Sequence, residues 1–315
     1  MTPLGRARLR LAPGVAALAL WASCVSAGGA PAQVGQPNPP PVSRAPAAAV
    51  PAGTPGSATT ISVVLAGGRT AADLFLPDTE GPVPVVVVAH GFSRTRATMR
   101  GWGPRLAAAG YLAAVPDLPA RSDHARNGTA ITDLLRQLEA GAAGRPVDAT
   151  REAVVGFSAG GLASVLAAAA HAGVALWVGL DPVDRGGAGA AAAATRSFPA
   201  VLLTAAPSAC NAHGNGAGIA ASLKGPWLSL AVAGASHCDP ESPGSRLCGM
   251  ICAGGWTEAR HAVFADYTTA ALDAVLRCRP EAWERLDAAR ADPRITRVTG
   301  PGLEPLRQVC AGPRP

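Results

Sequence analysis

The sequence is poor in charged residues, and lysine is almost absent from it. Charged side chains make up 15% of the 315 residues, and Lys224 is the only lysine. The formal net charge is +6, but the excess lies at the two ends, in Arg6, Arg8 and Arg10 and in the arginine-rich stretch 277–315. The region between is near neutral and has no basic stripe. We therefore expect no nucleic-acid partner.

No apolar run near the N-terminus is long enough to cross a bilayer. The run 11–21 follows three arginines and falls short of the roughly 20 residues that a spanning helix needs. Small residues come next, as in a secretory signal peptide, so we interpret residues 1–27 as an export leader. Two cleavage schemes remain open. Signal peptidase could cut after Ala27 or Ala32 and leave a secreted protein, or lipoprotein processing could lipidate Cys24 and tether the protein to the cell envelope.

Apart from Cys24, cysteine is absent from the first 209 residues of the chain. Six cysteines follow, namely Cys210, Cys238, Cys248, Cys252, Cys278 and Cys310. An even number in an exported protein predicts disulfides, for which 15 pairings are possible. Cys248 and Cys252 also have C-x₃-C spacing, but no second pair follows at the spacing of a zinc finger. We expect neither a metal nor a cofactor.

The folded part is expected to follow a flexible segment. Proline, alanine, glycine and serine dominate residues 28–57, a composition typical of a linker. Hydrophobic residues make up 49% of the chain, enough for a substantial core. We predict one domain over residues 58–279. The extension 280–315 is either a covering helix pinned by Cys310 or an unstructured tail.

Strand and helix signals alternate along the predicted domain. An antiparallel pair is predicted at 61–65 and 71–76, followed by strands at 83–89, 111–115, 153–157, 175–180, 201–205 and 227–232. Helices are predicted at 102–109, 131–143, 159–171 and 257–276. The continuously apolar run 83–89 is typical of a strand buried on both faces of a parallel sheet. The alternation predicts an α/β protein with a mostly parallel, doubly wound sheet flanked by helices, as in the α/β-hydrolase fold.

One pentapeptide between a predicted strand and a predicted helix has the pattern of a nucleophilic serine. Gly156-Phe157-Ser158-Ala159-Gly160 matches G-x-S-x-G, in which the serine occupies a strained turn and the glycines let neighbouring backbone pass closely. This motif predicts an α/β-hydrolase with Ser158 as its nucleophile. Two backbone N–H groups form the oxyanion hole of that fold. We assign them to Ala159, after the serine, and to Phe92, in the loop after strand 83–89.

A histidine after the serine should supply the general base, because the order in this fold is serine, acid, histidine. His237 directly follows the last predicted strand and is the candidate. His171 ends a helix, His213 comes too early and His261 lies inside the last helix. His90 precedes the serine, and we interpret it as a brace for its loop.

The acid is expected one strand earlier than in many of these enzymes. The loop 206–211, after the penultimate predicted strand, contains no carboxylate. The preceding strand 175–180 ends directly in Asp181, which is the first choice. Asp184 is the alternative, and Asp239 lies too close to His237 in sequence to orient it.

The stretch Leu180-Asp181-Pro182-Val183-Asp184 resembles the L-D-P-V-x-G sequence of the chlorophyllases. His90-Gly91-Phe92, the serine motif and Ser236-His237-Cys238-Asp239 lie in the same order in that family, as do Cys248, Cys252 and Gly254-Gly255 before a terminal helix. The likeness spans residues 82–276, and the early acid is also similar to that of platelet-activating-factor acetylhydrolases. It implies that Ser158, Asp181 and His237 form a catalytic triad. Ala159 departs from the polar residue that plant members often carry after the serine.

These patterns favour a serine carboxylic-ester hydrolase that acts on a small-molecule or lipid-like ester through an acyl-enzyme. An acyltransferase with the same serine is an alternative, in which an alcohol replaces water. A non-catalytic cell-envelope binding protein on a hydrolase scaffold is another. The loops 93–100, 118–128 and 185–197 are expected to shape the pocket, and the last, rich in alanine and glycine, is expected to be mobile.

Overall fold

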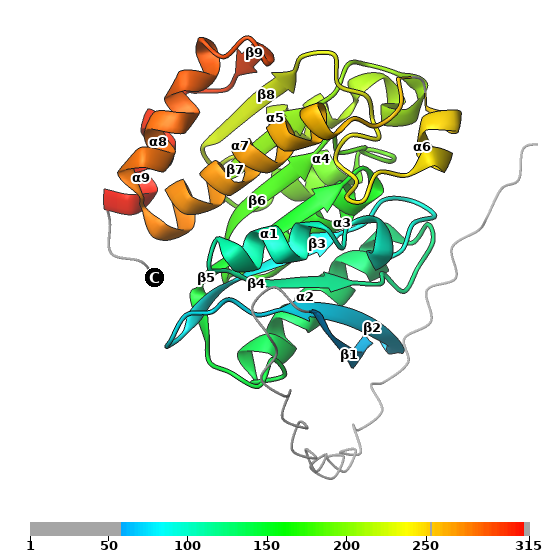
Figure 1. The fold of residues 1–315 in the computed structure, drawn as a ribbon, viewed down its shortest axis with the longest axis vertical. Helices are drawn as coiled ribbons and strands as arrows, with labels where there is room; N and C mark the ends of the chain where they lie inside the picture. The colour runs from blue at the N-terminus through cyan, green and yellow to red at the C-terminus, as the bar shows by residue number, and fades with distance from the viewer. Residues whose placement is uncertain (1–57, 253, 312–315) are drawn as a thin grey trace, which may run out of the picture. The chain divides into compact units, whose positions relative to one another are not determined.

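A computed structural model of the protein describes residues 58–252 and 254–311. The predicted leader, the linker and Cys24 lie outside this part of the chain. One nine-stranded sheet has the order β1-β2-β4-β3-β5-β6-β7-β8-β9 (Figure 1). Its strands are β1 (Ala58–Leu65), β2 (Gly68–Phe75), β3 (Val83–Ala89), β4 (Leu112–Pro116), β5 (Val147–Phe157), β6 (Val174–Leu180), β7 (Ala200–Thr204), β8 (Trp227–Val232) and β9 (Ile295–Thr299).

Helices follow most of the strands. They are α1 (Trp102–Ala108), α2 (His124–Glu139), α3 (Ala159–Ala170), α4 (Ala188–Ala193), α5 (Gly216–Ser222), α6 (Arg246–Ile251), α7 (Glu258–Arg277), α8 (Pro280–Asp287) and α9 (Glu304–Ala311), with short 3₁₀ turns η1 (Arg96–Thr98), η2 (Ala209–Gly214) and η3 (Ala288–Arg290). In the described residues, no helix is long and apolar enough to span a membrane.

The middle of the sheet is parallel and its edges are antiparallel. Strands β4, β3, β5, β6, β7 and β8 run parallel to one another. The β1–β2 hairpin joins one edge antiparallel to β4, and β9 joins the other antiparallel to β8. The predicted α/β class is therefore confirmed at this level, as a mostly parallel mixed sheet flanked by helices.

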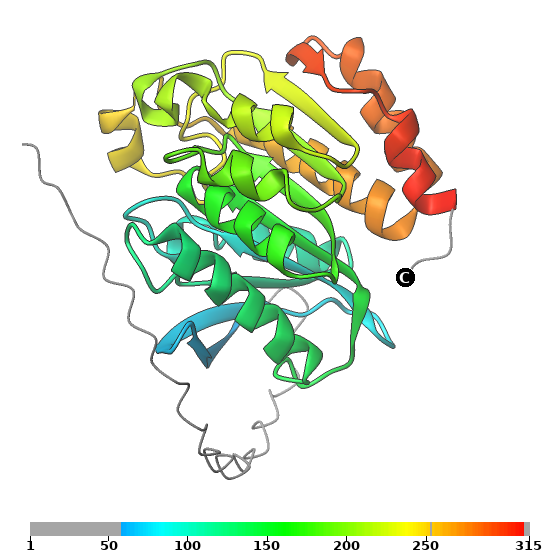
Figure 2. The ribbon, with the colours of Figure 1, turned by 180° about the vertical axis from the view of Figure 1, so that it is seen from behind.

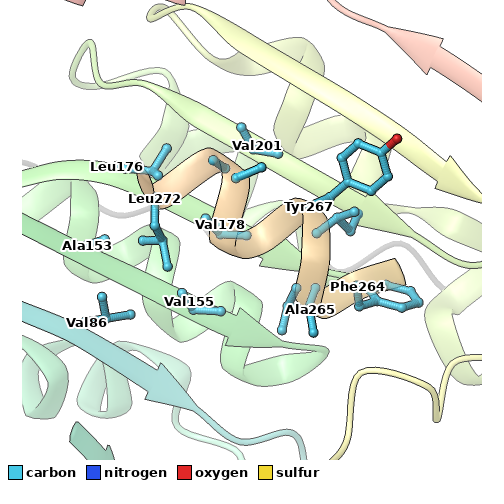
Figure 3. Packing of buried hydrophobic residues seen from close by; sticks show 14 of the residues in the cluster. Val86, Ala153, Val155, Leu176, Val178, Val201, Phe264, Ala265, Tyr267 and Leu272 are labelled. Atoms are coloured by element: carbon cyan, nitrogen blue, oxygen red, sulfur yellow. The ribbon is translucent and has the colours of Figure 1, made fainter. Parts of the chain in front are cut away.

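Two apolar layers hold the helices on the sheet. Buried residues of α1 and α7 pack on one face (Figure 1) and those of α2, α3 and α5 on the other (Figure 2). Figure 3 shows Phe264 and Leu272 of α7 beside strand residues such as Val155 and Val178, all of them buried. Because both faces are covered, the central strands are apolar at nearly every position, which explains the continuous run in β3.

Several segments differ from the sequence prediction. Strand β5 begins at Val147 and not at residue 153, and α5 and α6 lie where no element was predicted. Helix α2 begins at His124 and not at residue 131, because the Asp123 carboxylate accepts a hydrogen bond from the N–H of Arg126 and caps the first turn. The stretch 185–197, predicted as a mobile loop, contains α4. The Asp184 carboxylate accepts hydrogen bonds from the N–H groups of Gly189 and Ala190 at 2.8 and 3.0 Å and holds that helix in place.

The C-terminal extension continues the domain in the residues that the structure describes. Helix α8 packs on α7, β9 adds an edge strand to the sheet, and Cys310 of α9 is bonded to Cys278. Of the two alternatives left open for residues 280–315, these residues therefore favour the pinned, structured form.

Candidate active site

Ser158 sits on a sharp turn between β5 and α3. Its φ of 56° and ψ of −121° are sparsely populated for a residue with a side chain. The neighbouring glycines allow the turn: a Cβ on Gly156 would lie 2.3 Å from the Gly160 carbonyl oxygen, and a Cβ on Gly160 would lie 2.4 Å from the His90 carbonyl oxygen. Any larger residue would force the turn apart. The turn places the serine hydroxyl at the carboxyl edge of the sheet.

Ser158, His237 and Asp181 lie within hydrogen-bonding distance in series. The Nε2 atom of His237 is 2.9 Å from the Ser158 Oγ, and its Nδ1 atom is 2.6 Å from an Asp181 carboxylate oxygen. All three are buried, with 8% of Ser158 and 2% of Asp181 exposed. The side chains come from the ends of β5, β8 and β6, so the parallel strands bring together residues that are 56 and 79 positions apart. Serine, histidine and carboxylate in this order can activate the hydroxyl for nucleophilic attack.

Asp181 is held by two donors besides His237. The N–H of Ala205 donates to Oδ1 at 3.0 Å, and the Asn211 side-chain amide lies 3.1 Å from Oδ2. Asn211 is fully buried and is itself fixed by the N–H of Ser208. Because loop 206–211 contains no carboxylate, Asn211 was not among the predicted site residues. The pairing of Ser208 with a polar residue three positions later was the available signal, since it is typical of a capping box.

The other candidate acids have structural contacts. Asp184 accepts hydrogen bonds from two N–H groups in the first turn of α4, whose N-cap residue is Gly187. Asp239 accepts hydrogen bonds from Ser236, Thr257 and Arg260, and it thereby shapes the loop that carries His237.

The other three histidines considered as the base make no hydrogen bond with Ser158 among the residues that the structure describes. His171 pairs with Glu152 at 2.8 Å, at the end of α3 that lies away from Ser158. His261, in α7, packs against Trp102 of α1, and His213 is exposed in η2. His237 is therefore the histidine that the fold brings to the serine.

The two expected oxyanion donors flank the serine. Neither the Phe92 N–H nor the Ala159 N–H donates to a carbonyl in the described part of the chain, so both remain available. His90 holds the Phe92 loop: its Nδ1 lies 2.9 Å from the Gly91 carbonyl oxygen, and its Nε2 accepts from the N–H of Leu118 at 2.9 Å. This pattern puts the ring proton on Nδ1. Burial lowers the pKa of His90 and favours the neutral ring that the arrangement requires.

An ion pair connects the Phe92 loop to the histidine loop. The Arg94 guanidinium lies 2.6 Å from a carboxylate oxygen of Glu241, which is fully buried. Trp102 adds a hydrogen bond from its indole N–H to the Pro240 carbonyl at 2.9 Å. The Phe92 loop and the histidine loop are therefore fixed to each other.

Two disulfides surround the histidine loop. Cys238, next to His237, is bonded to Cys248, and Cys210, next to Asn211, is bonded to Cys252. The sulfur atoms of Cys238, Cys248 and Cys252 lie within 4.8 Å of one another. Because each is part of a disulfide, they offer no thiolate to a metal ion.

The chain matches a protein-family model over part of its length. Residues 30–208, more than half of the sequence, match the model described as PETase, PET hydrolase-like. The matched region includes Ser158 and Asp181 and ends before His237. No curated protein matches the chain. This family is related to the chlorophyllase-like enzymes that the sequence resembles, while the chlorophyllase resemblance itself stays a prediction. The chain therefore belongs to the PET hydrolase-like family, and it is an esterase-type hydrolase.

Proposed function

We propose that the protein is a serine carboxylic-ester hydrolase of the α/β-hydrolase fold that works through an acyl-enzyme on Ser158. The observation that carries the proposal is the hydrogen-bonded series from the Ser158 hydroxyl through His237 to Asp181. It lies beside two backbone N–H groups that have no carbonyl partner among the described residues. The proposal extends the family assignment from an activity class to named residues.

In the first half of the reaction, Ser158 Oγ attacks the ester carbonyl carbon while His237 Nε2 takes the hydroxyl proton. The carbonyl oxygen becomes negatively charged and accepts hydrogen bonds from the N–H groups of Phe92 and Ala159. Asp181 keeps the proton of neutral His237 on Nδ1 and stabilises the imidazolium that forms. His237 then gives its proton to the leaving alkoxide, and the alcohol departs.

In the second half, water replaces the alcohol. His237 takes a proton from the water as it attacks the acyl carbon, and Ser158 leaves with that proton. The products are a carboxylic acid and free enzyme. No cofactor takes part in these steps.

Hydrolysis of p-nitrophenyl esters of increasing acyl length tests the proposal. Ser158→Ala should lower kcat by at least about 10⁴-fold. Ser222→Ala, at a half-buried serine of α5, serves as the matched control and should keep the wild-type rate. A fluorophosphonate should label wild type and not Ser158→Ala.

Two results would contradict the proposal. The first is ester hydrolysis that persists in Ser158→Ala, and the second is a folded, disulfide-bonded protein that neither cleaves any ester nor reacts with the fluorophosphonate. Added alcohol separates the acyltransferase alternative, because a transferase would form mainly a new ester in place of the acid.

A further inference from the structure

A cavity of about 180 Å³ opens next to Ser158, where β3 and β4 end. Its lining includes Phe92 and Ala159, which carry the proposed oxyanion donors, and it continues along the loop after β4 to His124. A Cβ placed on Gly91, another lining residue, would lie 3.2 Å from the Ser158 Cβ. The cavity therefore begins beside the nucleophile.

The position of this cavity identifies the half of the ester that it can receive. In the sheet, β3 and β4 lie on one side of β5, and β6, β7 and β8 lie on the other. His237 comes from the end of β8, so the leaving oxygen, which takes its proton from His237, lies on that side of Ser158. The cavity is on the opposite side and therefore faces the acyl half.

The cavity lining is positively charged and contains no carboxylate. Its two arginines differ in their contacts. Arg94 is paired with buried Glu241 at 2.6 Å. Arg121 donates to the Ser93 hydroxyl at 3.0 Å and lies over the Phe92 ring, but no carboxylate pairs with it among the residues that the structure describes.

The acids nearest in sequence to Arg121 are occupied elsewhere. Asp117 accepts the N–H of Arg96 at 2.8 Å, and Asp123 accepts the N–H of Arg126 at 2.9 Å. His124 also lines the cavity, and its buried Nδ1 has no hydrogen-bond partner within the described chain. Burial lowers the pKa of His124 and favours the neutral ring, which has one N–H donor and one nitrogen acceptor.

We propose that this cavity binds an acyl group that ends in a carboxylate, so that the preferred substrates are half-esters of short dicarboxylic acids. The inference rests on the proposed esterase function. The Arg121 guanidinium holds the distal carboxylate through charge-assisted hydrogen bonds, and the Phe92 ring covers the chain between the two ends. At about 180 Å³ the cavity is smaller than the roughly 300–1,000 Å³ of typical ligand sites, which favours short acyl chains.

Matched substrates test where the anion is recognised. Monobenzyl glutarate carries a carboxylate at the acyl end, and its primary amide is a neutral analogue of nearly the same size. The kcat/KM for the carboxylate should exceed that for the amide by about tenfold, and the excess should shrink as NaCl is raised. A carboxylate in the alcohol half, as in 4-carboxybenzyl pentanoate, should bring no such gain over benzyl pentanoate.

The ratio of kcat/KM for the carboxylate to that for the amide is the readout for variants. Arg121→Gln should bring the ratio close to one, because it removes the charge. The ratio is needed because Arg121 also contacts Phe92, so the substitution can lower both rates. Arg126→Gln is the matched control: it lies on α2, outside the cavity lining, and should keep the wild-type ratio.

Calorimetric binding of both esters to Ser158→Ala gives a readout that needs no turnover. The inference is supported if Ser158→Ala binds the carboxylate ester more tightly than the amide ester and if the double variant Ser158→Ala/Arg121→Gln loses this difference. This result would stand even if the wild type cleaved neither ester. In that event only the esterase proposal would fail. Ser158-dependent hydrolysis with equal kcat/KM for both esters overturns the inference and leaves the esterase proposal intact. So does a ratio that Arg121→Gln leaves unchanged. Failure of both esters to bind also overturns the inference.

Discussion

Asp181 and Asp184 follow the same strand, three residues apart, and make different contacts. Asp181 has a φ of 44°, which aspartate tolerates better than most residues, and its carboxylate reaches His237. Asp184 lies past the turn and accepts hydrogen bonds from the first N–H groups of α4. The direction of the backbone after β6 therefore decides that Asp181, and not Asp184, contacts His237.

Substitution of the two aspartates should separate these contacts. Asp181→Asn should lower kcat by about 10³–10⁴-fold with little loss of stability, because an amide no longer stabilises the imidazolium. Asp184→Ala should cost about 1 kcal/mol of unfolding free energy through the hydrogen bonds lost at the first turn of α4 and leave kcat near the wild-type value. Steady-state kinetics and urea unfolding of both variants check this. Equal kinetic effects would count against Asp181 as the acid.

His171 should make stability depend on pH. Its hydrogen bond with buried Glu152 raises the pKa of His171 in the folded protein. The folded state therefore holds this proton more tightly than the unfolded chain, so the contribution is fully present below the unfolded pKa of about 6.5 and is lost as pH rises through the folded pKa.

The measurement is the difference in unfolding free energy between wild type and His171→Gln, from urea titrations at several pH values. That difference should be largest below about pH 6.5 and should shrink as the pH is raised beyond it. A difference that stays constant across this range, or that grows with pH, would show that the pair does not favour the protonated histidine.

At the scale of elements, short irregular segments at the carboxyl edge of the sheet carry the site. The 3₁₀ turn η2 carries Asn211, and the loop after β8 carries His237. Each segment is anchored by a disulfide, Cys210–Cys252 in the first case and Cys238–Cys248 in the second. The third, Cys278–Cys310, joins α7 to α9. Loops without regular hydrogen bonding need such anchors to hold side chains in position.

Two double variants compare a disulfide near the site with one that joins α7 to α9. Cys210 and Cys252 are 42 residues apart and Cys278 and Cys310 are 32 apart, so loss of either should cost about 3–4 kcal/mol by loop entropy. Cys210→Ser/Cys252→Ser should also lower kcat, because Asn211 loses its anchor. Cys278→Ser/Cys310→Ser should leave kcat unchanged at temperatures well below its Tm. Equal kcat values in the two variants would contradict this difference.

At the scale of the whole molecule, three disulfides and membership of the PET hydrolase-like family are compatible with export. Whether a leader is removed or Cys24 is lipidated stays a prediction. Disulfides persist in oxidising compartments and are rare in the cytosol, so the bonded state is itself a marker of location.

Alkylation tests the disulfide state of protein recovered from the medium or envelope of an exporting bacterium. Iodoacetamide under denaturing, non-reducing conditions should leave all six cysteines from Cys210 to Cys310 unmodified, and after reduction it should modify all six. Peptide mapping by mass spectrometry reads this directly. Modified Cys238 or Cys248 before reduction would contradict the pairing.

Local patterns in the sequence were enough to predict much of the fold and several residues of the candidate site. Some features depend only on neighbouring residues or on the order of the strands, and the sequence contains that information. They are the apolar run of β3, the G-x-S-x-G turn and the order of Ser158, Asp181 and His237. The start of α2 also has a local signal, the capping residue Asp123. The predicted start was too late because the apolar periodicity that marks a helix begins only further along the chain.

Only the tertiary structure decided the cysteine pairing, the contact of Asn211 with Asp181 and the unpaired charge of Arg121 beside the cavity. These features join segments that are distant in sequence, and the side chains of Asn211 and Arg121 give no local sign of where they point. Sheet order brings the segments together, and the direction of each side chain then depends on backbone angles and on neighbours from other elements. The sequence by itself therefore determined most of the strands, the longer helices and the class of chemistry, and packing decided which side chains meet.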